Sequence, residues 1–194
     1  MAFDITLIRH GKPEFVHTGR IAARRLPEWI AQYDRSEVGA DPVPVACRVA
    51  ARAAAHCLAS TAPRALSSLH ALGRTVVRTD PVFCEAQLPF AGWTWPRLPA
   101  AFWAGMFRLL WMCGYAHGAE SIGAARRRAR QGAYQLATLA ESGPVLLVGH
   151  GIMNRLIGRE LRALGWRAGG GHASEHWGAS VYRAAGSRFT RGHA

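Results

Sequence analysis

The sequence predicts an α/β fold, namely a three-layer α/β/α sandwich with a mostly parallel central sheet. Two observations support this expectation. Short apolar runs rich in β-branched residues stand near both ends of the chain, and segments of helical periodicity alternate with further strand-like runs. The chain has 194 residues, of which 49% are hydrophobic, which is enough for one well-filled core. We therefore expect a single domain over residues 1–194.

Two strands of similar design frame the predicted sheet. Residues 4–10 form an apolar run that ends at Gly11 and Pro13, as expected of a buried strand that stops at a loop. Residues 144–150 repeat the pattern, and each run ends in a histidine followed by a glycine. The apolar spacing after the second histidine predicts an amphipathic helix over residues 152–164. The other expected elements are helices over residues 44–58, 63–72 and 121–141, a short strand or loop at 59–61, and strands near 75–79 and 178–183.

A segment rich in aromatic residues, 92–115, interrupts this alternation. Prolines and arginines divide it into uncharged runs well short of the ~20 residues that a transmembrane helix needs, so we expect no membrane span. We interpret residues 86–117 or so as a helical insertion over the active site. Its apolar side chains either pack on the core or line a lid that faces the substrate, and the two roles are compatible. The aromatic residues are Trp93, Trp95, Phe102, Trp103, Phe107 and Trp111.

The composition is strongly basic, with a formal net charge of +12 to which Lys12 is the only lysine contributor. Such a charge suits nucleic acid, an acidic membrane surface or a phosphorylated substrate. An arginine-rich and alanine-rich composition also arises from codon bias, so charge alone does not select among these partners.

The cysteines give no sign of a metal or disulfide framework. Cys47, Cys57, Cys84 and Cys113 show no C-x-x-C spacing, and we expect reduced core thiols. Asp4 and Arg9 fall where a secretory leader would need an apolar core, so the expected location is cytoplasmic.

The residues that follow the two framing strands predict an anion site. Ligands of open α/β sheets bind beyond the carboxyl ends of the strands, and both His10 and His150 fall there. Arg9 precedes the first histidine, and the backbone N–H groups of the helix that opens at Gly151 suit an anion. Phosphate is the expected occupant.

Five short motifs occur in order along the chain. They are Leu7-Ile-Arg-His-Gly-Lys-Pro13, Ser60-Thr-Ala-Pro-Arg-Ala65, Phe83-Cys-Glu85, Gly118-Ala-Glu-Ser121 and Val148-Gly-His-Gly151. They resemble the Arg-His-Gly signature, the Ser-x-x-x-Arg-Ala segment, the acidic site, the Gly-Gly-Glu-Ser turn and the second-histidine motif of the histidine phosphatase superfamily, the phosphoglycerate mutase-like proteins. The resemblance spans nearly the whole chain.

This resemblance implies a phosphatase that hydrolyses a phosphomonoester, or a phosphohistidine, through a covalent phosphohistidine on His10. Arg9 and Arg64 would clamp the phosphoryl oxygens, and the backbone at Gly11 and Gly151 would complete the phosphate site. No metal and no cofactor are implied. The expected substrate is a small-molecule phosphate ester or a phosphoprotein.

Two further residues receive roles from the same resemblance. His150 would donate a hydrogen bond to a phosphoryl oxygen, so we expect it to be protonated while His10 is neutral. Glu85 would act as the general acid that protonates the leaving group, and would later accept a proton from water.

The sequence also departs from the family pattern. Val16 stands where the family often has a polar residue, the Gly-Gly-Glu-Ser turn is reduced to Gly-Ala-Glu-Ser, and residues 19–45 lack the usual family motifs. These departures bear on the substrate class more than on the chemistry. The chain is also short for a glycolytic mutase, so we expect a phosphatase. A phosphoglycerate mutase-type phosphoryl transferase is the alternative.

Three other functions are less consistent with the sequence. His172-Ala-Ser-Glu-His176 has the H-x-x-E-H spacing of a metallopeptidase group, but glycines precede it and Trp177-Gly178 ends it, so the helix that such a zinc site needs is not expected. A non-catalytic module that holds a phosphorylated ligand would not need all five catalytic groups. Nucleic-acid binding is not expected, because no recognised module is present.

Overall fold

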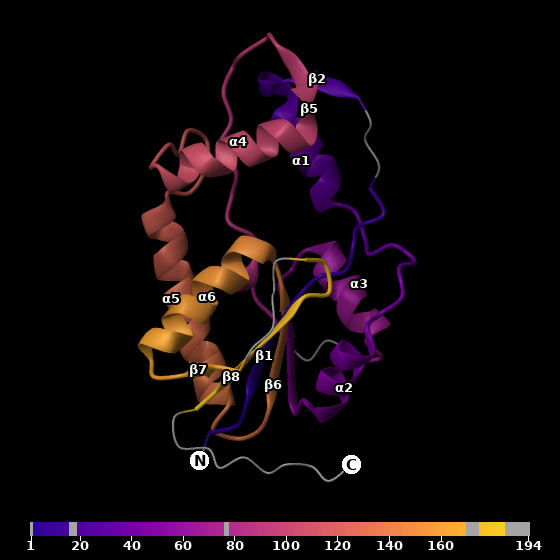
Figure 1. The fold of residues 1–194 in the computed structure, drawn as a ribbon, viewed down its shortest axis with the longest axis vertical. Coiled ribbons are helices and arrows are strands. Elements are labelled where there is room, and N and C mark those ends of the chain that lie inside the picture. Colours follow the sequence, from indigo (N-terminus) through magenta and orange to yellow (C-terminus); the bar gives the residue numbers. More distant parts are fainter. Residues whose placement is uncertain (1, 16–18, 76–77, 170–174, 185–194) are drawn as a thin grey trace.

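The computed structural model describes residues 2–15, 19–75, 78–169 and 175–184, and its centre is a six-stranded sheet in the order β4-β3-β6-β1-β8-β7 (Figure 1). The strands β4, β3, β6 and β1 are parallel, whereas β8 is antiparallel to both β1 and β7. The mostly parallel sheet is therefore confirmed. The strands are β1 (Ile5–Arg9), β3 (His56–Ala59), β4 (Arg78–Thr79), β6 (Val145–Gly149), β7 (Arg167–Ala168) and β8 (Ala179–Arg183).

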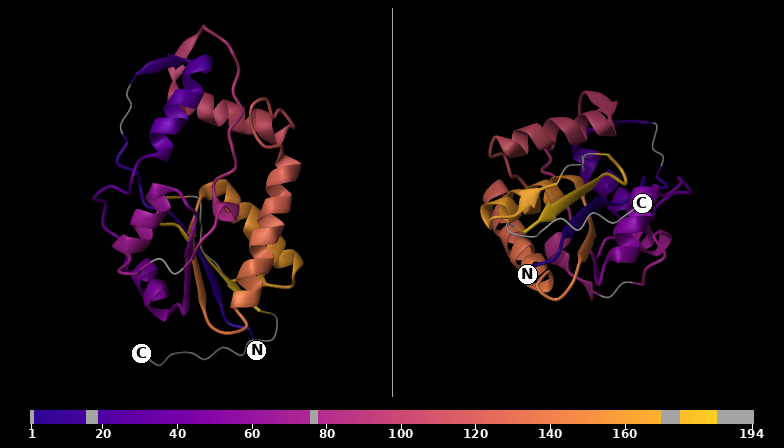
Figure 2. Two further views of the ribbon diagram at one scale, coloured as in Figure 1. Left: turned by 180° about the vertical axis from the view of Figure 1, so that it is seen from behind. Right: turned by 60° about the horizontal axis from the view of Figure 1, so that its bottom comes forward.

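Helices cover both faces of this sheet, as Figures 1 and 2 show. The helices α2 (Val45–Ala53) and α3 (Pro63–Ala71) lie on one face, and α5 (Ile122–Leu139) and α6 (Gly151–Ala163) lie on the other. Ile8 packs in the cluster of the first pair, and Leu7 packs in the cluster of the second. Because neighbouring residues of β1 face opposite layers, the strand is apolar on both sides, and the three-layer sandwich follows.

The strand β3 corrects one prediction. Residues 44–58 were expected to form one helix, but α2 ends at Ala53 and β3 begins at His56. Cys57 and Leu58 are buried beside β6, where they pair with Leu146 and Leu147. The alanine, histidine, cysteine and leucine of β3 have little preference for strands, so pairing with β6 imposes this conformation rather than local sequence.

Above the carboxyl ends of the parallel strands, two chain segments form a smaller assembly, which we call the lid (Figure 1). Residues 19–34 contribute β2 (Arg20–Ala22), the 3-10 turn η1 (Ala23–Arg25) and α1 (Leu26–Asp34). Residues 88–115 contribute β5 (Arg97–Pro99) and α4 (Ala100–Met112), and β5 pairs with β2. Trp103 and Phe107 of α4 pack against Leu26 in one cluster. The predicted aromatic insertion is thus one half of the lid, and the half formed by residues 19–34 was not predicted.

Candidate active site

His10 lies at the carboxyl end of β1 and is 2% exposed. Its Nδ1 lies 2.7 Å from the carbonyl oxygen of Gly11, so Nδ1 carries a proton and donates it. Arg64 Nε donates to the other ring nitrogen, Nε2, at 3.3 Å. A nitrogen that accepts from a guanidinium carries a lone pair, so the neutral ring presents an unprotonated Nε2 to the site. Burial and the charges of His150, Arg64 and Arg9 lower the pKa of His10 to about 2, against the opposing effect of the Gly11 carbonyl.

His150 follows β6, and its ring centroid lies 5.1 Å from that of His10. Arg64 Nη2 lies 3.4 Å from Nδ1 of His150, and a guanidinium can only donate, so Nδ1 is unprotonated. The other nitrogen, Nε2, therefore donates to Ser60 Oγ at 2.7 Å. Burial, and then the charges of Arg64, Arg9 and Arg128, lower the pKa of His150 well below its ordinary value. These neighbours favour the neutral ring, whereas the predicted cation refers to His150 beside a bound phosphate dianion.

Arg64 connects the two histidines to the lid. It occupies the first turn of α3, its residue exposure is 3%, and its guanidinium reaches His10 and His150. Its Nη1 also forms an ion pair with Asp34 Oδ1 at 2.9 Å, and the guanidinium lies 4.8 Å from the ring centroid of Tyr33. Asp34 is half exposed at the end of α1, so the buried arginine is held by a carboxylate at the edge of the pocket.

A third imidazole, which the sequence analysis did not assign to the site, lies beside Arg9. His176 Nε2 is 3.4 Å from Arg9 Nη2, and its ring centroid is 5.4 Å from that of His10. Burial, and then the charges of Arg9 and Lys12, lower the pKa of His176. The backbone N–H of Trp177 donates to the Arg9 carbonyl at 3.1 Å, which fixes the neighbouring His176 at this place.

Two residues of the sequence motifs, His172 of the H-x-x-E-H pattern and Val16 of the family pattern, lie outside the described residues. Glu175 and His176 lie in a bend and a turn rather than in a helix. Among the residues that the structure describes, no group of three or more His, Cys, Asp or Glu is placed to hold a metal ion.

Glu85 caps the N-terminus of α6. Its Oε1 accepts from the N–H groups of Met153 at 2.9 Å and Ala86 at 3.0 Å, and its Oε2 accepts from Ile152 at 3.2 Å. The carboxylate therefore occupies the positive helix end that the sequence offered to an anion. Of the first three N–H groups of α6, Glu85 takes two and leaves that of Gly151.

The Gly-Ala-Glu-Ser turn supports Glu85 from behind. Glu120 of this turn forms an ion pair with Arg128 of α5. Arg128 Nη1 in turn donates to the carbonyl oxygens of Val82 at 3.0 Å and Cys84 at 2.6 Å, directly before Glu85. The sequence analysis found the motif, whereas its structural role depends on a contact between elements that are distant in the chain.

Gly11 positions the ring of His10. Its N–H donates to Ser68 Oγ at 2.9 Å, and its carbonyl accepts from His10. A Cβ atom at position 11 would overlap the side chains of Val38 and Trp177. The N–H that was expected to bind phosphate is therefore already bound within the protein.

The sequence analysis missed Ser60 and Ser68, although Ser60 opens the Ser-x-x-x-Arg-Ala motif and Ser68 follows Arg64 by one helical turn.

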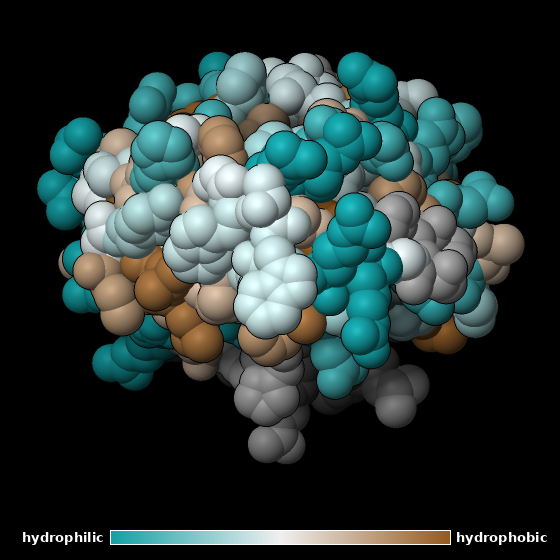
Figure 3. Space-filling model, turned by 90° about the horizontal axis from the view of Figure 1, so that it is seen from above, coloured by the Kyte–Doolittle hydropathy of each residue, from teal (hydrophilic) through white to brown (hydrophobic). Residues whose placement is uncertain are grey.

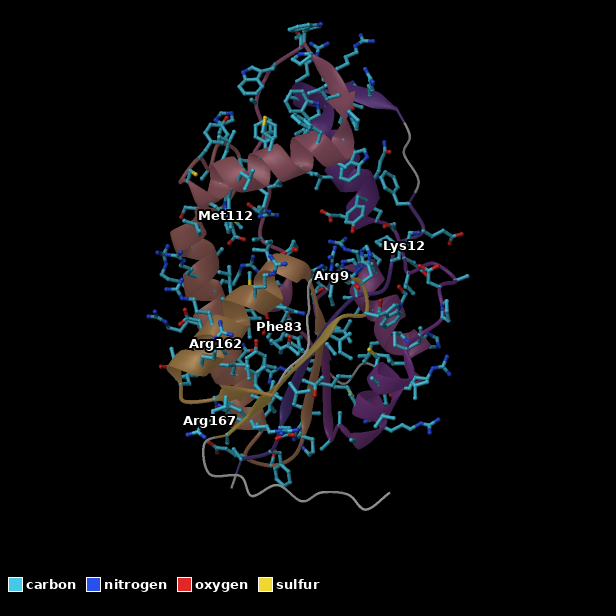
Figure 4. The ribbon with its side chains drawn as sticks, viewed as in Figure 1. Arg9, Lys12, Phe83, Met112, Arg162 and Arg167 are labelled. Carbon is cyan, nitrogen blue, oxygen red and sulfur yellow. The ribbon has the colours of Figure 1, made fainter. Side chains whose placement is uncertain are left out.

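A pocket of about 390 Å³ opens between this site and the lid. Arg64 and Glu85 form its inner end, and Figure 4 shows Arg9 and Lys12 at the same end of the sheet. The lid supplies most of the remaining walls. Among them are Trp29, Tyr33 and Asp34 of α1, Leu88 and Phe90 of the segment before β5, and Arg108 of α4.

The chain resembles known proteins in sequence pattern and in fold. The sequence model of the histidine phosphatase superfamily (branch 1) matches residues 5–190. Similar solved structures include mycobacterial hydrolase 1, with 20% identity, a TM-score of 0.61 and coverage of 93% of this chain and 88% of that chain. A mycobacterial glucosyl-3-phosphoglycerate phosphatase has 22% identity, a TM-score of 0.54 and coverages of 85% and 80%. A phosphoserine phosphatase variant from Entamoeba histolytica, in complex with phosphoserine, has 17% identity, a TM-score of 0.57 and coverages of 92% and 89%. Identities this low establish the shared fold alone, and no curated protein sequence matches the chain.

Proposed function

The chain belongs to the histidine phosphatase superfamily, and on this premise we propose that it is a phosphatase that hydrolyses phosphomonoesters through a phosphohistidine on His10, without a metal ion. One observation carries the proposal. His10 is a buried neutral imidazole whose Nδ1 proton is bound by the Gly11 carbonyl and whose Nε2 lone pair faces Arg64. With its pKa lowered to about 2, His10 stays unprotonated over the physiological pH range, as a nitrogen nucleophile must.

We expect the phosphoryl group to lie among Arg9, Arg64 and His150. Arg64 would turn its Nη1 from Asp34 to the phosphoryl oxygens, where a planar guanidinium can donate two hydrogen bonds. A dianion beside His150 would favour the imidazolium, so that its Nδ1 would change from acceptor to donor toward the phosphate. The N–H of Gly151 would add a further donor.

The chemistry then follows from the two reacting groups. Nε2 of His10 attacks phosphorus, the N–P bond forms as the P–O bond of the leaving group breaks, and Glu85, which must enter this step as the carboxylic acid, gives its proton to the leaving oxygen and becomes the carboxylate. Oε2 of Glu85, which accepts a single N–H at 3.2 Å, is the oxygen with room for that proton. In the second step Glu85 takes a proton from water, the water oxygen attacks phosphorus, and the N–P bond breaks to release phosphate and regenerate neutral His10.

The pocket of about 390 Å³ would receive the leaving group. It adjoins both Arg64 and Glu85, so a substrate whose phosphate is held by Arg64 would extend its leaving group into this space. The side chains of Trp29, Leu88 and Phe90 favour an apolar or planar group there. A mutase-type transferase or a phospholigand-binding module would use the same arginines and histidines, and no observation on the described residues favours either over hydrolysis.

The first experiment combines turnover with detection of the intermediate. Purified protein should hydrolyse a generic aryl phosphate in the presence of a chelator, and rapid quenching should trap an acid-labile phosphoenzyme. His10→Ala should abolish both signals, while the fold, followed by circular dichroism, persists. A folded wild type that binds inorganic phosphate but neither turns over nor becomes phosphorylated would overturn the catalytic proposal in favour of a binding module.

A further inference from the structure

The outer face of the lid, formed by α4 and the loop before β5, is apolar, and residues 86–119 contain no Asp or Glu. On α4, Trp103, Phe107 and Trp111 are buried at helical spacing and form the inner face. The opposite face of the helix carries Phe102, Gly105, Leu109 and Met112. The exposed fraction is 54% for Phe102, 65% for Leu109 and 48% for Met112. A helix of a soluble protein usually turns charged residues outward on this face, and α4 does not.

The one charged residue of α4 is turned away from this outer face. Arg108 Nη2 donates to the carbonyl oxygen of Ala86 at 2.8 Å, and its guanidinium lies 5.0 Å from the ring centroid of Trp111. Arg108 therefore belongs to the inner side of the lid, and the outer side of α4 has no charge between Phe102 and Met112.

The apolar face continues from α4 into the loop before β5. Trp95 is 82% exposed, and Trp93, which is half exposed, lies 5.9 Å from the ring of the buried Phe107. Seen from the lid end, brown and nearly white residues occupy a continuous part of the surface with teal residues along its border (Figure 3). Contiguous apolar surfaces of this kind mark sites of contact with another molecule or with a membrane.

The charged residues around this face indicate which kind of surface could bind to it. Residues 86–119 contain no Asp or Glu, and the carboxylates of α1 are engaged, Glu28 with Arg25 and Asp34 with Arg64. The exposed side chains at the border of the loop are basic. Arg24 is tied through its backbone N–H to the carbonyl of Trp93, and Arg97 stands opposite Ala22 in the β2–β5 ribbon.

We infer that the outer face of the lid docks on an anionic phospholipid surface. Exposed tryptophans suit the interface between headgroups and acyl chains, leucine and phenylalanine enter the outer acyl region, and arginines contact the phosphates. No helix in the described ranges is long and apolar enough to cross a membrane. A second copy of this chain is less suitable, because it would bring the arginines of both borders together without a carboxylate to pair them.

Vesicle binding tests this inference independently of catalysis. Wild-type protein is mixed with vesicles of phosphatidylcholine and phosphatidylglycerol, or of phosphatidylcholine alone, and the bound fraction is measured by sedimentation and by tryptophan fluorescence. We expect binding to the anionic vesicles that weakens with salt, and a blue shift of the emission on binding. Leu109→Glu and Arg97→Glu should each lower the partition coefficient by about tenfold or more.

Matched controls separate the lid from the general basic charge. Val49→Glu changes an exposed apolar residue of α2, and Arg167→Glu makes the same charge reversal at the opposite end of the molecule from Met112 (Figure 4). Both controls should bind as the wild type does. Absence of wild-type binding, or an equal loss in the lid and control variants, would overturn the inference. Self-association that Leu109→Glu abolishes, without vesicle binding, would assign the face to a second copy instead.

Discussion

Acid should destabilise this fold through its buried histidines. Because the pKa of His10 falls from 6.5 to about 2 on folding, the native state binds fewer protons than the unfolded chain between these two values. Stability is therefore highest above pH 6.5 and is lost as the pH falls through this window. From an unfolded-state pKa of about 6.5, linkage gives a loss of about 1.4 kcal/mol from His10 alone when the pH falls from about 7.5 to about 5.5. His150, whose pKa is also lowered, adds a loss of the same sign.

Urea unfolding at these two pH values, followed by tryptophan fluorescence, measures the effect. His10→Gln removes the contribution of His10, so the variant should lose about 1.4 kcal/mol less stability than the wild type over the same interval. His70→Gln, on the exposed side of α3, is the matched control and should keep the wild-type dependence. An equal loss in wild type and His10→Gln would show that the fold does not hold His10 neutral, and the assignment of Nε2 as the nucleophile would fail.

Three further substitutions test the surroundings of the nucleophile. Ser60→Ala leaves the Nε2 proton of His150 without its acceptor, which should cost about 1–3 kcal/mol and lower kcat/KM for an aryl phosphate; unchanged kinetics would show that Ser60 does not orient His150. Asp34→Asn removes the carboxylate that competes for Arg64, so calorimetry should show inorganic phosphate binding about two- to fivefold tighter, and weaker binding would contradict this competition. Gly11→Ala should lower stability in thermal unfolding by about 1–3 kcal/mol, because its Cβ overlaps packed side chains; a wild-type melting curve would count against that close packing.

The sequence predicted the site best where one strand both contributes apolar residues to the core and ends at a site residue. The apolar runs before His10 and His150 predicted β1 and β6, and the structure pairs these strands in parallel with Arg9 opposite Gly149. Two parallel neighbours in this register end at the same level, so their following histidines meet. The predicted closeness of His10 and His150 therefore needed only local signals and one rule about parallel sheets.

The parts that local sequence could not predict depend on contacts between distant segments. The strand β3 takes its conformation from β6, and β2 takes its partner from β5, far along the chain. His176 lies at the site because the backbone N–H of Trp177 donates a hydrogen bond to the Arg9 carbonyl. The spacing of apolar residues in the sequence does not predict this contact. Likewise, the sequence predicted an anion at the N-terminus of α6 without identifying it, and the structure shows that the carboxylate of Glu85 lies there.

The position of Glu85 changes how a helix end contributes to the proposed reaction. Helix N-termini commonly bind phosphate, but here the N–H groups of Ile152 and Met153 hold the carboxylate instead. In the proposed reaction the phosphoryl group is therefore held mainly by the side chains of Arg9, Arg64 and His150, which come from elements of the sandwich, and the helix end contributes only the N–H of Gly151. The region 19–45, where the family pattern is weakest, supplies Asp34 and other walls of the adjoining pocket. In this proposal the side chains that bind the phosphoryl group come from the sandwich, whereas most of the leaving-group pocket is lined by the lid, so substitutions in the lid should change the choice of substrate more than the chemical step.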